Sequence, residues 1–221
     1  MDGATLQAKI YAGYARAAKS IGIAYDQYRP LSVSQPLGNK VATVKMAVDS
    51  GKQYTFVSPN EYGDPTWLAL IDDATVAPGD YLVANNGGLN INTYFIAGKQ
   101  FLLPVLAIEC NHSIRISRQA SVSAEGAVDY SGLSRANEVN ILGAEGALWP
   151  ASVLFGGRAQ GPMGLPTGAR QSGWRILLPP SVPVTIGAGD VATDDLGRRY
   201  LVDGAELTDL GWRIQANELH T

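Results

Sequence analysis

A chain of 221 residues is long enough for one large domain or for two small domains, each with its own core. Hydrophobic residues make up 46% of the chain and charged residues 17%, so much of the surface must be neutral and polar or covered by a partner. The net charge is −3 and the basic residues are scattered, which excludes the clustered Lys and Arg of a nucleic-acid-binding surface. We therefore expect no nucleic-acid partner.

The single cysteine, Cys110, excludes an intrachain disulfide. It lies in the apolar run VLAIEC, where a small buried thiol is expected. The N-terminus lacks the basic start and apolar core of a signal peptide, and no apolar run approaches the roughly 18 to 20 residues of a membrane span. We expect a soluble protein that is made in a cytoplasm and has no membrane partner.

The first residues predict an amphipathic helix, because apolar side chains recur at steps of three and four. These side chains are Leu6, Ile10, Tyr14, Ala17 or Ala18, and Ile21. Asp2 or Thr5 can cap the start of the helix, and Gly22 can end it. Many alanines make the apolar face thin, so this helix can pack on its own core or dock on a partner.

An extended connector is predicted over residues 24–40, AYDQYRPLSVSQPLGNK, which contain two prolines and no clean period. Alternating strands begin near Val41 with VATVKMAV, and YTFV follows at residues 54–57. Two later blocks, which start at Trp67 and Trp174, share one order of features. Each block has a Trp strand, a Pro-containing link, a Gly-Asp turn, a short strand, a Tyr strand and a second glycine. The paired positions are Gly79-Asp80 with Gly189-Asp190, and Gly98 with Gly204.

The expected fold is mainly β, with two small related β-barrel or sandwich units, an N-terminal α-helix and an extended linker. The helix and arm would occupy residues 1–40, the first β unit 41–120 and the second 121–221. A Gly- and Pro-rich loop is predicted at residues 156–173. If the blocks are repeats, residues 41–118 and 138–219 superpose with the same strand order. Trp67 then matches Trp174, and Gly79 matches Gly189.

No pattern of catalytic chemistry stands out, and we predict no catalytic, cofactor-binding or metal-binding residues. His112 and His220 lie far apart, and the pairs Asp72-Asp73 and Asp194-Asp195 adjoin turns, where hydrogen-bonding turn formers are expected. Phosphate-loop and nucleophile-elbow motifs are missing. The four tryptophans could stack on sugars, which would make a carbohydrate-binding module, although three adjoin apolar strand patterns that favour core positions. A hydrolase with an unrecognised site is a weaker alternative.

The runs PGDYLV, TYFIAGKQFLLPVLAI and GDVATDDLGRRYLVDGAELTDLGW resemble structural proteins of tailed bacteriophages and prophages. The last run is similar to the small β-barrels of head-closure and tail-connector proteins, and YDQYRPLSVSQPL is similar to uncharacterised proteins of tail gene clusters. The resemblance implies a virion component that forms a homo-oligomeric ring, is made in the host cytoplasm and has no cofactor. Head-closure proteins usually have a single barrel, so two units favour the tail or baseplate over the neck. The implied partners are tail tube, hub or baseplate subunits.

Two segments are the candidate subunit contacts. The helix offers Leu6, Ile10 and Tyr14, carried outward by the irregular arm. The loop at 156–173 is expected to be mobile in the free protein and to become ordered in the assembled particle. Its contacts would be Arg158, Met163, Leu165 and Arg170.

Overall fold

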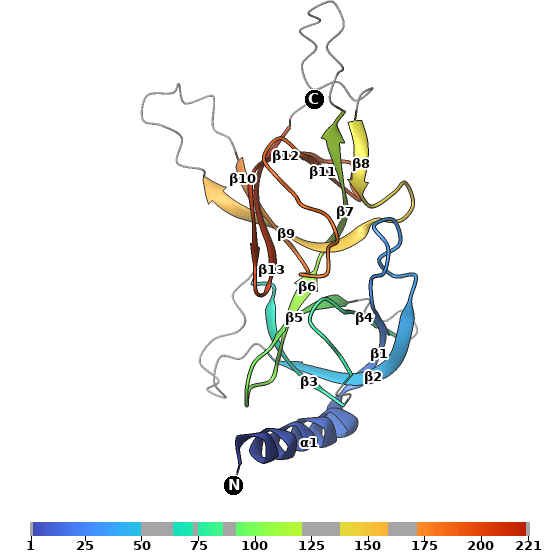
Figure 1. The fold of residues 1–221 in the computed structure, drawn as a ribbon, viewed down its shortest axis with the longest axis vertical. Coiled ribbons are helices and arrows are strands. Elements are labelled where there is room, and N and C mark those ends of the chain that lie inside the picture. Colours follow the sequence, from blue (N-terminus) through green and yellow to red (C-terminus); the bar gives the residue numbers. More distant parts are fainter. Residues whose placement is uncertain are drawn as a thin grey trace, which may run out of the picture.

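The computed structural model describes residues 2–49, 64–72, 75–85, 92–120, 138–158 and 172–219. These residues form a helix followed by two closed β-barrels, which are stacked along the long axis of the molecule (Figure 1). The helix, α1 (Gly3–Ile21), crosses the lower end of the first barrel, and the second barrel lies above the first. The expected fold class, two β units with an N-terminal helix, is confirmed.

Both ends of α1 follow from the residues that flank it. The Asp2 carboxylate accepts a hydrogen bond from the Ala4 backbone at 3.0 Å and caps the start. Gly22 ends the helix with an extended backbone, not with a left-handed one. A Cβ at Gly22 would lie 2.5 Å from the Ala18 carbonyl oxygen and 2.8 Å from the Met46 carbonyl carbon. Glycine is therefore required because the helix end lies directly against the neighbouring strand.

The first barrel is closed by six antiparallel strands. In spatial order they are β1 (Ile23–Tyr28), β2 (Lys40–Asp49), β3 (Thr66–Ile71), β6 (Val105–Cys110), β5 (Thr93–Lys99) and β4 (Tyr81–Ala84), and β4 pairs back to β1. Buried apolar side chains form its core, and they include Tyr25, Met46, Leu82, Tyr94 and Ile96.

The second barrel has the same spatial order. Its strands are β7 (His112–Gln119), β9 (Trp149–Arg158), β10 (Ser172–Leu178), β13 (Gly211–Glu218), β12 (Arg199–Thr208) and β11 (Val191–Asp194), and β11 pairs back to β7. A further strand, β8 (Glu138–Leu142), pairs with the part of β7 that β9 does not reach. Together, β8 and β9 take the place that β2 holds alone in the first barrel, so the strand orders match as expected.

Register supports the match between the two tryptophans. Trp67 lies opposite Ala107 in the pairing of β3 with β6. Trp174 lies opposite Ala216 in the pairing of β10 with β13. A register shift also falls at the same place in both barrels, between Ile96 and Gly98 and between Val202 and Gly204.

The two Gly-Asp turns match in the same way. The Gly79 N–H donates to the Ile96 carbonyl at 2.7 Å, and the Gly189 N–H donates to the Val202 carbonyl at 2.9 Å. Both glycines have a positive φ, as their place in a tight turn requires. The repeated pattern in the sequence therefore corresponds to a repeated backbone structure.

The barrel boundaries differ from the expected ones. The first barrel begins at Ile23, inside the segment expected to be a connector, and the second begins at His112, which was assigned to the first unit. Only Asn111 separates β6 from β7. The alternation of β1 was hidden because Gln27, a polar residue, occupies a fully buried position where an apolar one would be expected.

The cores of the two barrels are separate clusters, but the cluster of the second barrel extends onto residues of the first. In β5, Tyr94 and Ile96 belong to the core of the first barrel, while Phe95 and Ala97 belong to the cluster that contains the second. The Tyr81 hydroxyl donates to the Pro150 carbonyl at 2.8 Å and joins the two barrels directly. The two barrels therefore pack as one body.

The segment between β1 and β2 also packs on the second barrel. The Val33 carbonyl accepts hydrogen bonds from the Trp149 indole at 2.7 Å and from the Gly143 N–H at 2.9 Å. Residues 29–39 thus connect the barrels and do not extend the helix outward. The tether expected between the helix and the first β unit is replaced by Gly22 alone.

Candidate functional site

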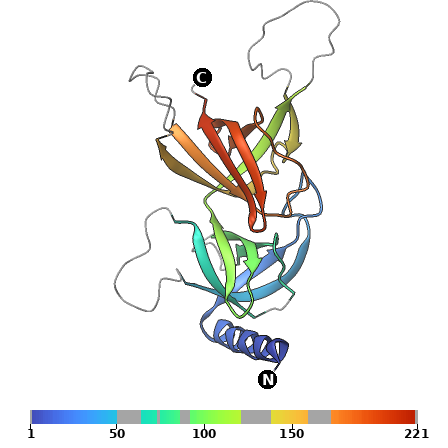
Figure 2. The same ribbon diagram turned by 60° about the vertical axis from the view of Figure 1, so that its left-hand side comes forward.

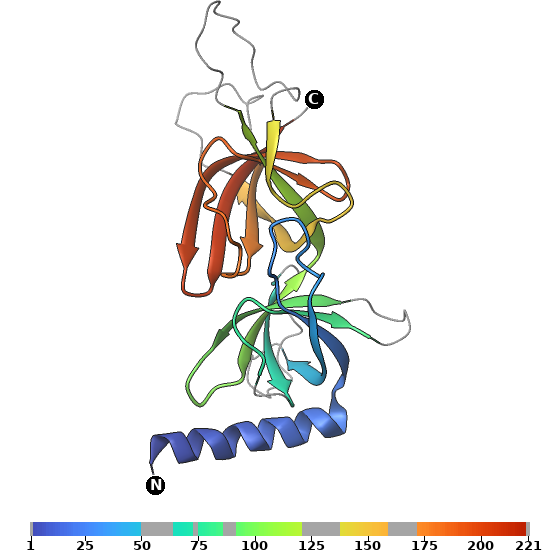
Figure 3. The same cartoon turned by 45° about the vertical axis from the view of Figure 1, so that its right-hand side comes forward.

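The lower end of the first barrel, covered by α1, is the first candidate site (Figure 3). Only Ala18 of the helix is fully buried against β2 and β3. Of the three predicted contacts in the helix, Ile10 and Tyr14 are half-buried and Leu6 is 40% exposed. The structure therefore places Tyr14 on the chain's own barrel and leaves Leu6 accessible.

Hydrogen bonds hold α1 at its middle and near its C-terminal end. The Tyr11 and Tyr14 hydroxyls donate to the carbonyls of Gln100 (3.1 Å) and Leu102 (3.3 Å) in the turn between β5 and β6. Near the C-terminal end, the Lys45 Nζ donates to the Lys19 carbonyl at 3.2 Å. Polar contacts therefore supply much of the attachment that a thin alanine face does not.

A cavity of about 390 Å³ separates the middle of α1 from the barrel. Its helix wall includes Ala8, Ala12 and Ala15, and its barrel wall includes Ala69, Ile71 and Val105. The alanine side chains are too short to fill this space. Next to it, Phe101 and Leu103 of the β5–β6 turn are 59% and 50% exposed. An apolar, partly covered surface of this kind favours binding.

The second predicted contact region lies elsewhere. Residues 156–158 and 172–173 were expected in the loop but belong to the paired strands β9 and β10. A register shift follows Gly173, and glycine is tolerated at such irregular positions of a strand. Arg158 is the last residue of β9, and Met163, Leu165 and Arg170 lie outside the described residues. The paired ends of β9 and β10 lie in the upper barrel, far from α1 (Figure 2). The two expected contact regions therefore do not form one site.

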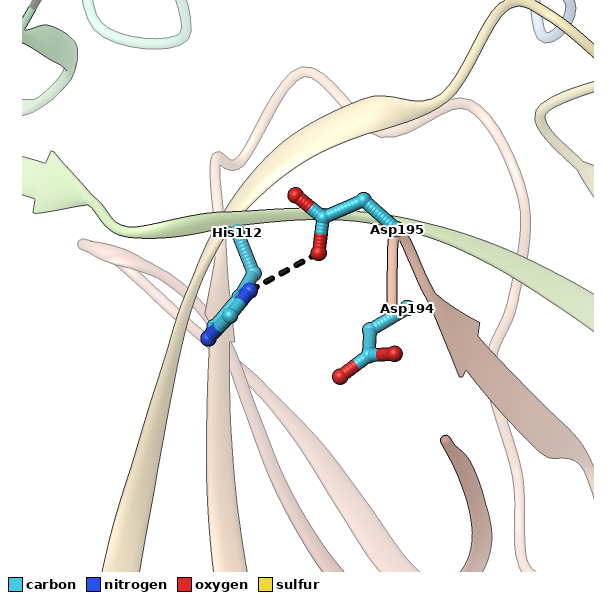
Figure 4. Close-up of side chains that lie close together, drawn as sticks. All are labelled: His112, Asp194 and Asp195. Carbon is cyan, nitrogen blue, oxygen red and sulfur yellow. Dashed lines mark hydrogen bonds and ion pairs between the residues drawn. The ribbon is translucent and has the colours of Figure 1, made fainter. Parts of the chain in front are cut away.

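A second candidate is a polar cluster that the sequence did not predict. The side chains of His112, Asp194 and Asp195 meet, and their ligand atoms lie within 4.8 Å of one another (Figure 4). His112 Nδ1 lies 2.8 Å from Asp195 Oδ1, although 83 residues separate them in the chain. No local spacing signals such a contact, which is why sequence reasoning missed it.

The bonds of Asp194 show what this cluster does. Asp194 Oδ1 accepts from the N–H groups of Leu196 (3.0 Å) and Arg198 (2.8 Å), and Oδ2 accepts from Arg198 Nε (2.7 Å) and the Tyr200 hydroxyl (3.0 Å). Burial raises the pKa of Asp194, but the bonds from Arg198 and Tyr200 outweigh it and hold this pKa below its ordinary value.

The guanidinium of Arg198 also lies 3.1 Å from His112 Nε2, so a cation already bridges Asp194 and His112. To bind a metal ion or to accept a proton from a substrate, Asp194 and His112 would need the lone pairs that Arg198 already engages. The cluster therefore ties the β11–β12 turn to β7, and the predicted turn-forming role of Asp194 is confirmed.

The tryptophans do not form a sugar platform. Trp149 is fully buried and Trp212 nearly so. The Trp67 indole donates to Glu109 at 2.9 Å, and the Trp174 ring packs edge-on against Phe155 and Tyr200. The Arg198 guanidinium lies over the Trp174 face. Stacking on a sugar needs a set of open ring faces on one surface, and these four side chains do not form such a set.

Cys110 behaves as an inert thiol. Burial, and the neighbouring charge of Glu109, raise the pKa of its side chain. A thiol in this state forms little thiolate, although Cys110 is half-buried and not fully buried as expected.

Comparison of the chain with protein-family models, with curated proteins and with solved structures finds no match. Among the described residues, no helix combines the length and the apolar character needed to cross a membrane.

Proposed function

We propose that this chain is a structural subunit of a bacteriophage particle. In this proposal it forms an oligomeric ring around the tail tube or hub near the baseplate, and other tail proteins are its partners. The observation that carries the proposal is the lower end of the first barrel. There, α1 buries one side chain completely and leaves an apolar cavity bordered by exposed Phe101 and Leu103. Surfaces of this kind mark protein contacts.

The described polar clusters favour a structural role over catalysis. The carboxylate of Asp194 and the ring of His112 are engaged by Arg198, and the buried carboxylates of Asp80 and Asp190 are bonded to arginines. Groups that act as acids, bases or nucleophiles must be free to bond a substrate. These groups instead hold strands and turns in place.

The motifs PGDYLV and GDVATDDLGRRYLVDGAELTDLGW support the virion class, because they resemble phage tail and connector proteins. Within that class, two stacked barrels favour the tail or baseplate over a neck connector, in which a single barrel is usual. The burial of Trp149 and Trp212 counts against a carbohydrate-binding module.

Purified particles test the proposal. Particles banded from a culture that expresses the gene are analysed by mass spectrometry and by immunogold electron microscopy with antibodies to this chain. Label at the distal end of the tail is expected. Label at the head–tail junction would favour the neck connector, and absence of the chain from the particles would refute the proposal.

A further inference from the structure

We infer that the cavity beneath α1 receives the β12–β13 hairpin of a second copy of this chain. The inference rests on the proposed function, because it supplies the contact between neighbouring subunits of the ring. Two features carry it: a basic border around the apolar cavity, and an acidic hairpin tip with exposed leucines on the same chain.

The cavity side is apolar with positive charges along it. Ala8, Ala12, Ala15 and Lys19 are spaced by four, three and four residues, so they lie in one stripe along α1. Arg16 follows Ala12 by one turn, on the same side of the helix. The helix contains Lys9, Arg16 and Lys19 and no acidic residue, although the whole chain has a net charge of −3.

Other charges at the cavity have defined positions. Lys45 approaches the end of the stripe, where its Nζ donates to the Lys19 carbonyl. Lys99 lies on the cavity wall. The acid on that wall, Asp72, accepts a hydrogen bond from the Lys45 backbone at 2.8 Å. The border is therefore mainly basic around an apolar floor.

The hairpin side has the complementary character. Leu207 and Leu210 are 55% and 43% exposed, and Glu206 and Asp209 beside them are exposed acids. Arg213, the basic residue near the tip, pairs with Glu206 at 2.6 Å, so Asp209 is the acid most available to a partner. Leucine side chains suit the apolar floor, and the acids suit its basic border.

The hairpin tip is also rigid, which lowers the entropic cost of docking. The Thr208 hydroxyl donates to the Gly211 carbonyl at 2.8 Å and accepts from the Leu210 N–H at 3.3 Å. Leu210 additionally borders Gly98 of its own first barrel, so Leu207 is the more available of the two leucines.

The two surfaces are different patches of one chain, on the first and second barrels. A contact between unlike patches is heterologous, and repeated copies then form a ring if the rotation closes. A two-fold dimer would instead pair like with like.

The first experiment measures the oligomeric state of the purified full-length chain by sedimentation velocity at low and high salt. Association at low salt that weakens at least tenfold in affinity at 500 mM NaCl is expected. Two double variants, Arg16→Glu with Lys19→Glu and Glu206→Lys with Asp209→Lys, should each be monomeric, and mixing them should restore association. The control Glu145→Lys, at an exposed acid of the second barrel, should associate normally.

The second experiment locates the contact by crosslinking. Ala12→Cys and Leu207→Cys are introduced separately into the Cys110→Ser chain, so that the half-buried native thiol cannot react, and the two chains are mixed and treated with a short bismaleimide. Crosslinked dimers are expected from this mixture. A mixture of Ala12→Cys with Leu196→Cys, at another exposed leucine, should give none.

A chain that is monomeric at every concentration would overturn the inference. Association that is unchanged in both charge-reversal variants would also overturn it, as would equal crosslinking of Ala12→Cys with Leu196→Cys. These results are separate from those of the particle experiment. A monomeric chain that is nevertheless present in tails would leave the proposed function standing. Ring formation by a chain absent from particles would refute only that function.

Discussion

Gly79 and Gly189 share one backbone conformation in the two barrels, but only Gly79 touches the other barrel. Their φ angles are 92° and 89°. A Cβ at Gly79 would lie 2.6 Å from the Ser181 Cβ, whereas a Cβ at Gly189 would meet nothing within 4 Å. Ser181 also donates its hydroxyl to the Gly79 carbonyl at 2.8 Å. The repeated turn in the first barrel has therefore become part of the contact between barrels.

Alanine at each glycine separates backbone strain from this contact. Gly189→Ala should lower the free energy of unfolding by about 1 to 2 kcal/mol, the cost of a left-handed L-residue. Gly79→Ala should cost about 1 to 3 kcal/mol more, because the new methyl overlaps Ser181. Urea unfolding measures both. In the Ser181→Gly background the excess should vanish, and equal costs in the wild-type background would contradict the contact.

Buried carboxylates hold the same turns in both barrels. Asp80 bonds the Arg29 guanidinium through both oxygens, at 2.7 and 2.8 Å, and also accepts from Gln27 at 2.7 Å. Asp190 bonds Arg118 in the same way, at 2.7 and 2.9 Å. Arg118 lies in β7 and Arg29 directly follows β1, so each pair ties the Gly-Asp turn to the first strand of its barrel or to the end of that strand.

Asp80→Ala and Asp190→Ala should each lower the free energy of unfolding by about 1 to 3 kcal/mol, because the turn N–H groups of Ala77 and Gly187 lose their acceptors, while the half-exposed arginines can turn to solvent. Asp80→Ala should be the more damaging, since the buried Gln27 also loses its partner. Chemical denaturation at pH 7 measures the change. Glu145→Ala, at an exposed position, is the control and should change stability little. A comparable loss in the control would show that the pairs are not the cause.

Asp194 makes the free energy of unfolding depend on pH. Its pKa in the folded protein is lower than the ordinary value of 3.8, so its stabilising contribution is present above about pH 4 and is lost as the pH falls through the folded pKa. Asp194→Asn should cost about 3 kcal/mol at neutral pH. The difference in the free energy of unfolding between this variant and the wild type should become smaller below pH 4. Guanidinium unfolding at pH 7, 5, 4 and 3 measures it, and a constant difference across this range would contradict the prediction.

Deletion of residues 1–17 tests whether α1 belongs to the core. The truncated chain keeps Ala18 and Gly22 and should remain folded, with a loss of about 2 to 4 kcal/mol from the bonds of Tyr11 and Tyr14 and some apolar burial. It should also fail to enter particles. Near-ultraviolet circular dichroism and thermal unfolding report the fold. Unfolding of the truncated chain would place the helix in the core of the first barrel. The double variant Tyr11→Phe with Tyr14→Phe measures the contribution of the two hydroxyls alone.

Local features could be predicted from the sequence because short-range physics determines them. The apolar period from Leu6 to Ile21 and the carboxylate of Asp2 predicted α1, although Leu6 and Ile21 are exposed in the structure. The left-handed glycines at Gly79 and Gly189 mark equivalent turns, and repeated order around them predicted two related barrels. Each signal lies within a few residues of the structure that it specifies.

Contacts across the chain were decided only by the tertiary structure. β1 belongs to the first barrel because Gln27 reaches Asp80, 53 residues away, and this polar pairing leaves no hydrophobic period to detect. His112 meets Asp195 only because β7 and β11 pair, and the cavity beneath α1 exists only because the helix crosses an open barrel end. Backbone conformation is encoded locally, whereas the partners of a buried polar group and the shape of a cavity depend on how distant strands close a barrel.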